Sequence, residues 1–243
     1  MRHALLFARL LPLVACGTHA DAIATPPPPP PDPPPATATA TATATPTATP
    51  TATATPTATA TSDPPLPCRG VALAIVLDRS GSMSGEPIAM AKRAAAAAID
   101  DLGSDDCAAV IAFDSTPKRI VPLAEVAPAT MHAAIDRVDA GGGTELLAAV
   151  DLARHELQKA PRARMRHVVL LTDGQSPQAG IRDLVDGMKA EGITLSAVGL
   201  GGGIDDALLR MMAERGGGRT YFVRDPRSLV ATFRREVDAI TKK

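Results

Sequence analysis

From about residue 69 to its end, the chain alternates short apolar runs with amphipathic stretches, and this alternation limits the fold more than any other feature. The runs at residues 71–77 and 167–172 are almost continuously apolar, as in strands buried on both faces of a sheet. Strands that alternate with helices predict a doubly wound α/β domain, with a mostly parallel six-stranded sheet and helices on both faces.

The six predicted strands cover residues 71–77, 108–113, 119–123, 167–172, 193–199 and 219–223. The predicted helices cover residues 87–102, 130–138, 145–159, 181–191 and 207–215, followed by a closing helix that starts near Pro226. A short connection containing Pro117 joins the second and third strands, so we expect an antiparallel hairpin there. Thr130 is a candidate N-cap, and glycines at 192 and 216–218 should end the helices before them.

The segment before this domain has almost no residues that could form a core. Residues 26–35 are proline except for Asp32, and residues 36–61 alternate alanine with threonine. Such sequences cannot offset the entropy cost of ordering. We expect residues 17–67 to be a disordered stalk before a folded domain at residues 68–243, which at about 175 residues can bury its own core. A tolerated low-complexity expansion without a spacer role is the alternative.

Residues 1–16 have the order of a secretory signal, with a basic start, a short apolar segment and then small residues. Residues 13–17 resemble the lipobox of bacterial lipoproteins, in which the signal is cut just before a lipidated cysteine, here Cys16. This resemblance implies an exported protein, lipid-anchored to the bacterial cell envelope at the outer membrane or cell surface. A plain cleaved signal peptide, which would give a secreted protein, is the alternative.

If Cys16 is lipidated, Cys68 and Cys107 remain as a pair, each just before a predicted strand. An exported protein meets an oxidising compartment, so a disulfide between them is chemically allowed. The bridge requires the first two strands to be parallel neighbours, which would put both cysteines at one edge of the sheet. Two unrelated buried thiols are the alternative.

Oxygen-bearing side chains cluster after the strands. Asp78, Ser80 and Ser82 follow the first strand, Asp173 follows the fourth, and Thr144 follows three glycines just before a helix. In open parallel sheets, ligands bind beyond the carboxyl ends of the strands, so these segments should share one rim. Two carboxylates and three hydroxyls suit Mg²⁺ or Mn²⁺, whereas Zn²⁺ favours nitrogen and sulfur ligands. Taken singly, each residue could also be a turn former or a helix cap.

The runs at residues 78–83, 142–144 and 172–174 together resemble the metal-ion-dependent adhesion site of von Willebrand factor type A domains, and the resemblance covers about residues 70–240. It implies that the first loop supplies three ligands, the second loop one and the third loop one, and every motif position matches. The ligands implied are Asp78, Ser80, Ser82, Thr144 and Asp173. The family's strand order also places the first two strands side by side, as the disulfide requires.

Two carboxylates leave a six-coordinate divalent ion unsaturated, with hydroxyls and water in its other positions. The Asp or Glu side chain of a protein partner can then displace a water. We therefore expect a protein-binding module that uses Mg²⁺ or Mn²⁺, with Ca²⁺ also compatible. A scaffold subunit of an envelope complex is the alternative, and the pattern does not indicate an oligomeric state.

Other classes fit less well. A formal net charge of −1, no Trp and a single Tyr argue against nucleic-acid binding, and a membrane would be contacted only through the anchor. The glycine runs lack the Lys-Ser/Thr ending of a P-loop. Catalysis is not expected: His132, His155 and His167 should be surface residues away from the rim, so no Ser-His-Asp arrangement can be argued. A phosphatase of the Asp-x-Asp type would need an aspartate where Ser80 stands.

Overall fold

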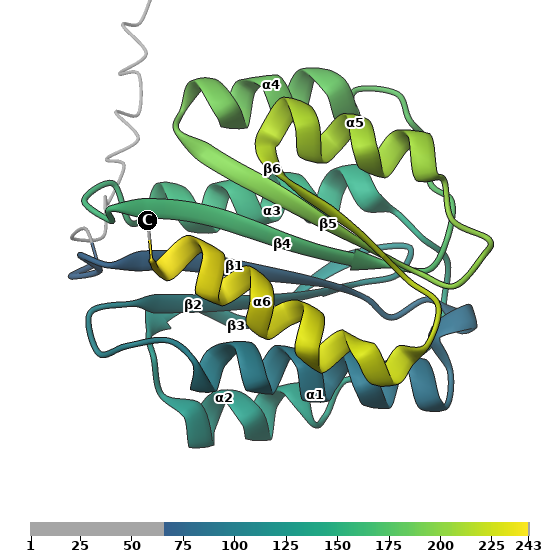
Figure 1. Cartoon of the computed structure of the whole chain (residues 1–243), viewed down its shortest axis with the longest axis horizontal. Coiled ribbons are helices and arrows are strands. Elements are labelled where there is room, and N and C mark those ends of the chain that lie inside the picture. Colours follow the sequence, from purple (N-terminus) through teal and green to yellow (C-terminus); the bar gives the residue numbers. More distant parts are fainter. Residues whose placement is uncertain (1–65, 243) are drawn as a thin grey trace, which may run out of the picture. The chain divides into compact units, whose positions relative to one another are not determined.

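The computed structural model describes residues 66–242. The signal peptide, the lipidation of Cys16 and the stalk up to residue 65 lie outside these residues and stay predictions, whereas Leu66, predicted as stalk, donates its N–H to the Lys159 carbonyl of the domain. The strands are β1 Val71–Asp78, β2 Cys107–Phe113, β3 Pro117–Glu125, β4 Met165–Thr172, β5 Ile193–Leu200 and β6 Gly217–Val223. They form one six-stranded sheet in the order β3-β2-β1-β4-β5-β6, in which only β3 runs antiparallel to its neighbour. The predicted fold class is confirmed (Figure 1).

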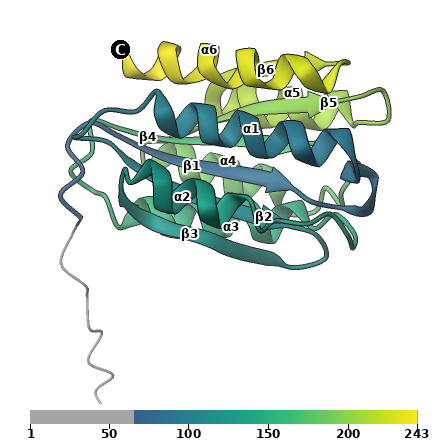
Figure 2. The ribbon, with the colours of Figure 1, turned by 90° about the horizontal axis from the view of Figure 1, so that it is seen from below.

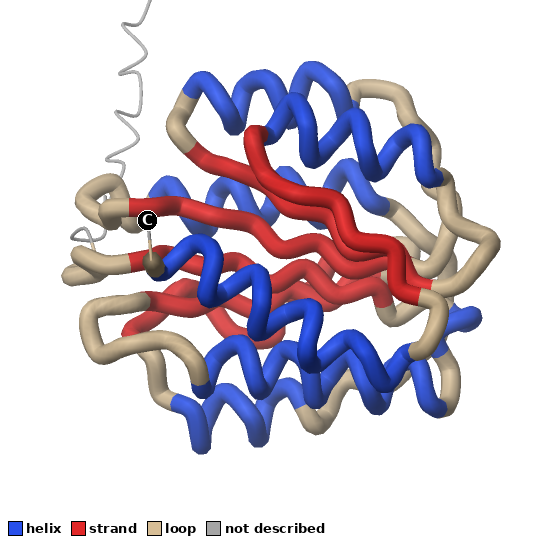
Figure 3. Tube along the Cα trace, in the orientation of Figure 1, coloured by secondary structure: helices blue, strands red, loops and turns tan. Residues whose placement is uncertain are grey.

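Helices cover both faces of the sheet (Figures 2 and 3). The face under α1, α2 and α6 and the face under α3, α4 and α5 each have their own apolar core. The bounds are α1 Glu86–Asp100, α2 Pro128–Ile135, α3 Leu146–Gln158, α4 Ile181–Ala190, α5 Asp206–Gly216 and α6 Leu229–Thr241, with short 3₁₀ turns η1 Gly81–Met83 and η2 Pro226–Ser228. None of the described helices is long and apolar enough to cross a bilayer.

The central strand β1 shows why the sheet carries two helical layers. All eight of its residues are buried. Leu73, Ile75 and Leu77 pack toward α1 and α6, and the smaller Ala72 and Ala74 pack toward α3. Since successive side chains of a strand point to opposite faces, an uninterrupted apolar run needs cover on both sides. Ala149 and Ala153 of α3 belong to the same core as the small residues on that side.

Several local predictions were wrong. Thr130 lies inside α2, whose N-cap is Ala127, because Pro128 at the first helical position already has the φ angle of a helix. The closing helix starts at Leu229, since residues from Pro226 first form η2. The glycine run does end α5 as predicted: Gly216 is its last residue, and Gly217, at a φ of 69°, makes the left-handed turn into β6. His167 is buried in β4 and is no surface residue.

A disulfide joins Cys68 to Cys107, with their Cα atoms 5.7 Å apart. It lies where β1 and β2 begin, at the edge of the sheet opposite the strand carboxyl ends. Ala72 pairs with Cys107 in the parallel β1–β2 register, and this pairing brings the two cysteines together. Of the two alternatives that the sequence left open, a disulfide or two unrelated buried thiols, the structure has the disulfide.

Candidate metal centre

The carboxyl ends of β1 and β4 lie side by side, because the two strands pair in parallel register. Asp78 ends β1, and Asp173 directly follows β4. Both aspartates therefore come to the same rim of the sheet, on the right in Figure 1. The rim also receives η1, which carries Ser82 and comes directly after Ser80.

Asp78 is fully buried at this rim. Its Oδ1 accepts a hydrogen bond from the Ser80 backbone N–H at 2.8 Å, and its Oδ2 accepts one from Thr172 Oγ1 at 2.6 Å. Burial raises the pKa of Asp78; the bonds from Thr172 and Ser80 lower it in part, and the nearby Asp173 carboxylate raises it further. A cation at this rim would therefore stabilise the ionised form of Asp78.

Two serine hydroxyls face the second carboxylate. Ser80 Oγ and Ser82 Oγ are 3.1 Å apart. Ser82 Oγ donates to Asp173 Oδ1 at 2.9 Å, and Ser80 Oγ approaches the same oxygen at 3.4 Å. The tight 3₁₀ turn puts both hydroxyls on one side of the loop, so residues far apart in the chain converge on Asp173.

Thr144 reaches the site from the loop before α3. A Cβ atom added at Gly174 would lie 3.3 Å from Thr144 Oγ1, so this hydroxyl packs against the turn that follows Asp173. The structure thus brings all five predicted residues to one rim. Their donors are all oxygens, and only two are carboxylates, which is the chemistry that hard divalent cations favour. Among the described residues, no three His, Cys, Asp or Glu side chains form a metal-binding group.

An ion pair missed by the sequence reasoning joins the loops of this site. Arg79, a spacer in the motif, pairs with the Asp114 carboxylate and donates from Nη1 to the Asp139 carbonyl at 2.7 Å. Its own backbone carbonyl accepts from the Gly141 N–H. The pKa of Asp114 is lowered, first by a hydrogen bond from the Thr116 backbone and also by the charge of Arg79. No local signal links an arginine to an aspartate that follows another strand.

Gly142 allows this arrangement. Its φ is 87°, and an added Cβ would lie 2.8 Å from the Cβ of Asp114. The Gly142 carbonyl also accepts from the Gly81 N–H at 3.1 Å. The glycines before Thr144 are therefore needed for a close approach of backbone to side chain. They hold the second loop against the first.

A second buried carboxylate lies away from the rim, between the sheet and α6. Glu236 is fully buried and accepts from Ser196 Oγ at 2.8 Å, from Tyr221 OH at 2.7 Å and from Arg219 Nη1. His167 Nε2 lies 3.1 Å from its Oε1. Burial raises the pKa of Glu236, but contacts with His167, Tyr221 and Ser196 outweigh burial and lower it to about 2. This cluster fastens α6 to three strands.

Comparisons with known proteins point to one family. The sequence profile of the von Willebrand factor type A domain matches residues 72–235. An uncharacterized protein of Synechocystis is 34% identical over 166 residues, which cover 67% of this chain and 40% of the relative. The chain therefore spans only about two fifths of that relative's length.

Solved structures agree. A von Willebrand factor type A structure from Catenulispora acidiphila is 28% identical, with a TM-score of 0.64, and the match covers 70% of this chain and 42% of the other. Proximal thread matrix protein 1 from the mussel byssus, solved with a zinc-occupied MIDAS motif, is 22% identical with a TM-score of 0.59. That match covers 71% of this chain and 47% of the mussel protein, and at this identity it shows the fold alone.

Proposed function

This chain belongs to the von Willebrand factor type A family, and on that premise we propose that its folded domain binds a partner protein through a divalent cation. The observation that carries the proposal is the convergence of five side-chain oxygens on one rim of the sheet. They belong to Asp78, Ser80, Ser82, Thr144 and Asp173.

The five residues would hold Mg²⁺ or Mn²⁺, with Ca²⁺ also compatible. Asp78 and Asp173 supply the charge, and the hydroxyl oxygens supply neutral ligands. Two carboxylates leave the cation open to a further anionic ligand, and an Asp or Glu side chain of the partner would take that position. The Arg79–Asp114 ion pair ties the first loop to the residue that follows β2, and backbone hydrogen bonds join the first loop to the second, so the ligands need little rearrangement. The mussel protein, which shares the fold, holds zinc at its own MIDAS motif.

We propose a binding module, not an enzyme. Ser80 stands where an Asp-x-Asp phosphatase carries its acid/base aspartate. His167 lies away from the rim, where it contacts the Glu236 carboxylate. Its Nδ1 lies 2.6 Å from Thr194 Oγ1. A scaffold subunit of an envelope complex remains the second candidate, because a protein-binding domain of this family can serve in either setting.

The placement in the cell rests on the N-terminal sequence. We propose a signal peptide at residues 1–16 with Cys16 lipidated, a stalk at residues 17–67 and the domain at residues 68–243. The lipid would anchor the chain to the cell envelope, and the stalk would carry the metal site away from the membrane. Intact-mass analysis of the protein extracted from membranes tests this, because a mature chain without acyl groups on Cys16 would contradict it.

Calorimetric titration of the full chain with Mg²⁺ and Mn²⁺ tests the metal site. Asp78→Ala should abolish binding and leave the circular dichroism spectrum unchanged. Asp105→Ala is the matched control, because Asp105 is exposed at the opposite rim and should leave metal binding intact. Equal metal affinity in the two variants would refute the site.

Partner binding is tested by pull-down from envelope extract with the full chain as bait, in Mg²⁺ and in excess chelator. Metal-dependent capture that Asp78→Ala abolishes supports the adhesion mechanism. Capture that is the same in chelator would instead support the scaffold alternative.

A further inference from the structure

The two edge strands of the sheet differ in how their outer backbone groups are protected. At the β3 edge, Pro122 has no N–H to offer, and the Leu123 N–H donates to the buried Glu156 carboxylate at 2.9 Å. The β2–β3 register also shifts beside Val110. Proline, bulges and capped amides are the usual means by which an edge strand avoids pairing with another chain. The β3 edge is therefore closed.

The β6 edge has no proline and, among the described residues, no side chain that caps an outward amide, although its register with β5 shifts between Leu195 and Ala197. Its Arg219 N–H bonds to Ser196 Oγ of β5, and its Val223 carbonyl accepts from the Gly201 N–H that follows β5. Since residues two apart in a strand direct their backbone groups to the same side, Thr220 and Phe222 direct theirs outward. Within the described residues, β5 is the only strand that pairs with β6. Two outward N–H and two outward C=O groups are thus available.

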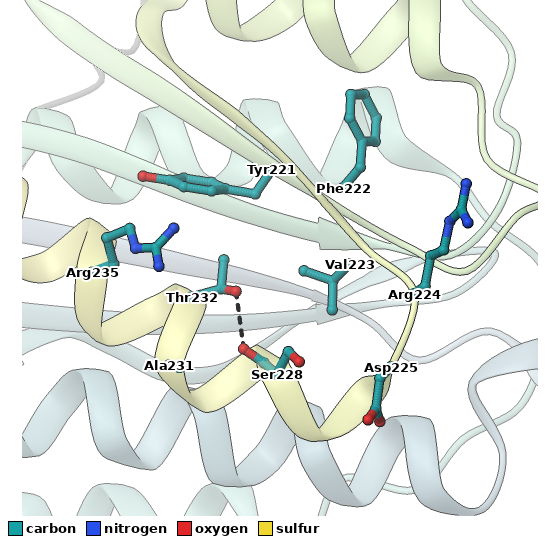
Figure 4. A pocket seen from close by; sticks show the side chains of 9 residues that line it. All are labelled: Tyr221, Phe222, Val223, Arg224, Asp225, Ser228, Ala231, Thr232 and Arg235. Carbon is teal, nitrogen blue, oxygen red and sulfur yellow. Dashed lines mark hydrogen bonds between the residues drawn. The ribbon is translucent and has the colours of Figure 1, made fainter.

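Hollows lie on both sides of this edge. A groove of about 620 Å³ runs between β6 and α6, lined by residues that include Tyr221, Val223 and Thr232 (Figure 4). A second hollow of about 390 Å³ lies beside the loop after β5, and the two share Phe222 and Arg224. Side chains of an added strand alternate between its faces. They would therefore enter the two hollows in turn.

The charges at this edge are mostly positive, although Asp206 lines the second hollow together with Arg224. Arg235 of α6 lies beside Tyr221 on the α6 side, and the Arg224 side chain extends away from α6 (Figure 4). Arg210 stacks 4.5 Å from the centre of the Phe222 ring. Among the described residues, neither Arg224 nor Arg235 forms an ion pair, whereas the neighbouring Arg234 pairs with Asp101. Asp225, the acid in the groove, caps the Arg227 N–H at 3.0 Å.

From the open edge, the flanking hollows and the two unpaired arginines, we propose that β6 binds an acidic, extended segment of another protein as an additional strand. Backbone hydrogen bonds to Thr220 and Phe222 would supply affinity, as in other cases of strand addition. Tyr221 and Arg224 are three residues apart, about 10 Å along a strand. A segment with two acidic residues three positions apart would place one on each face, near Arg235 and Arg224.

A second copy of this chain fits the edge poorly. An antiparallel pair of β6 edges would bring Arg224 and Arg235 of both copies into one interface without carboxylate partners, and the repulsion of like charges disfavours it. The same arginines that disfavour self-association attract an acidic strand. The β6 edge is also separate from the metal ligands, so this binding does not depend on the proposed cation site.

Fluorescence anisotropy of the full chain tests the proposal. The probe is a labelled, capped peptide of alternating valine and threonine with two glutamates three positions apart, and the control probe has glutamine in their place. Replacing Arg224→Gln and Arg235→Gln together should weaken binding of the glutamate probe about tenfold, from about threefold for each exposed ion pair. Arg234→Gln, the matched control on the same helix, should change affinity less than about twofold.

Thr220→Pro tests the backbone contribution, because proline removes an outward N–H and is tolerated on edge strands. It should weaken binding of the glutamate probe at least about fivefold, as expected for losing one hydrogen bond. The thermal melt of this variant should match that of wild type. Binding should persist in chelator and in Asp78→Ala, which separates this result from the metal site.

Three results would overturn the proposal. The first is no binding of the glutamate probe, and the second is equal affinity for the glutamine probe. The third is a dimer, seen by analytical ultracentrifugation, that Thr220→Pro dissociates, because the edge would then belong to a second copy of this chain.

Discussion

Asp78 and Glu236 are both fully buried carboxylates, yet their surroundings drive their pKa values in opposite directions. Asp78 receives two hydrogen bonds and faces another carboxylate, Asp173. Glu236 receives bonds from Ser196, Tyr221 and Arg219 and lies beside His167. Burial is the same in both cases, so the partners decide which protonation state is stable.

The difference separates a binding role from a structural one. A buried charge that is fully paired contributes to stability once its partners are in place, and removing one partner is costly. A buried charge with too few partners lowers the stability of the fold, and a bound cation would compensate it. Glu236 is of the first kind and fastens α6 to the sheet. Asp78 is of the second kind, at the rim where we propose the metal.

The largest effect should come from removing each charge in metal-free protein. Glu236→Gln should lower the free energy of unfolding by about 3–4 kcal/mol, because the hydrogen bonds from His167, Tyr221 and Ser196 that hold its charged form would be weakened. Asp78→Asn in excess chelator should change stability by less than about 1 kcal/mol or raise it, since an ill-compensated charge is removed. Urea unfolding at neutral pH measures the free energy of unfolding of both variants. Equal losses of stability would contradict the proposed difference between the two carboxylates.

Lowering the pH should have opposite effects on stability through Glu236 and through Asp78. The pKa of Glu236 is about 2 when folded, against an ordinary value of 4.5. Its contribution, about 3 kcal/mol, is therefore fully present above pH 4.5 and is lost as the pH falls toward 2. The pKa of Asp78 is raised, so protonating it favours the metal-free folded state. Urea unfolding across this pH range should show a flatter acid loss in Glu236→Gln than in wild type.

Mg²⁺ should stabilise the folded domain through the Asp78 rim and should not act on the Glu236 cluster. At a free Mg²⁺ concentration a hundredfold above its Kd, binding should add about 2.7 kcal/mol to the folded state. For a domain of this size, the gain corresponds to a rise in Tm of about 5–10 °C. Glu236→Gln should keep this rise, although from a lower starting Tm, and Asp78→Asn should lose it. Thermal melts of each variant with Mg²⁺ and with chelator measure this change in Tm.

The smallest effect should come from taking one donor from Glu236. Tyr221 donates to its Oε2 at 2.7 Å, and burial followed by this bond raises the pKa of Tyr221 to about 12. Tyr221→Phe should lower the unfolding free energy by about 1.5 kcal/mol and leave Mg²⁺ affinity unchanged. A loss of Mg²⁺ affinity would mean that the two carboxylates are coupled.

The strands and the five rim residues could be predicted because their signals are local. An unbroken apolar run such as residues 71–77 indicates a doubly covered strand, and Asp78, Ser80 and Ser82 lie within a few positions of one another. The burial of His167 could not be predicted, since it depends on Glu236, which belongs to a helix far along the chain. The Arg79–Asp114 pair could not be predicted either, because only the sheet brings the two loops together.

The disulfide at the start of β1 also determines how the domain bears mechanical force. Cys68 lies at the start of the domain, just before β1, so tension applied to the chain on its N-terminal side reaches Cys68 first and is shared by β1 and, through Cys107, by β2. Both strands are interior to the sheet, and peeling either away would break hydrogen bonds to two neighbours. The rim with Asp78 and Asp173 lies at the far end of these strands, shielded from the point of loading.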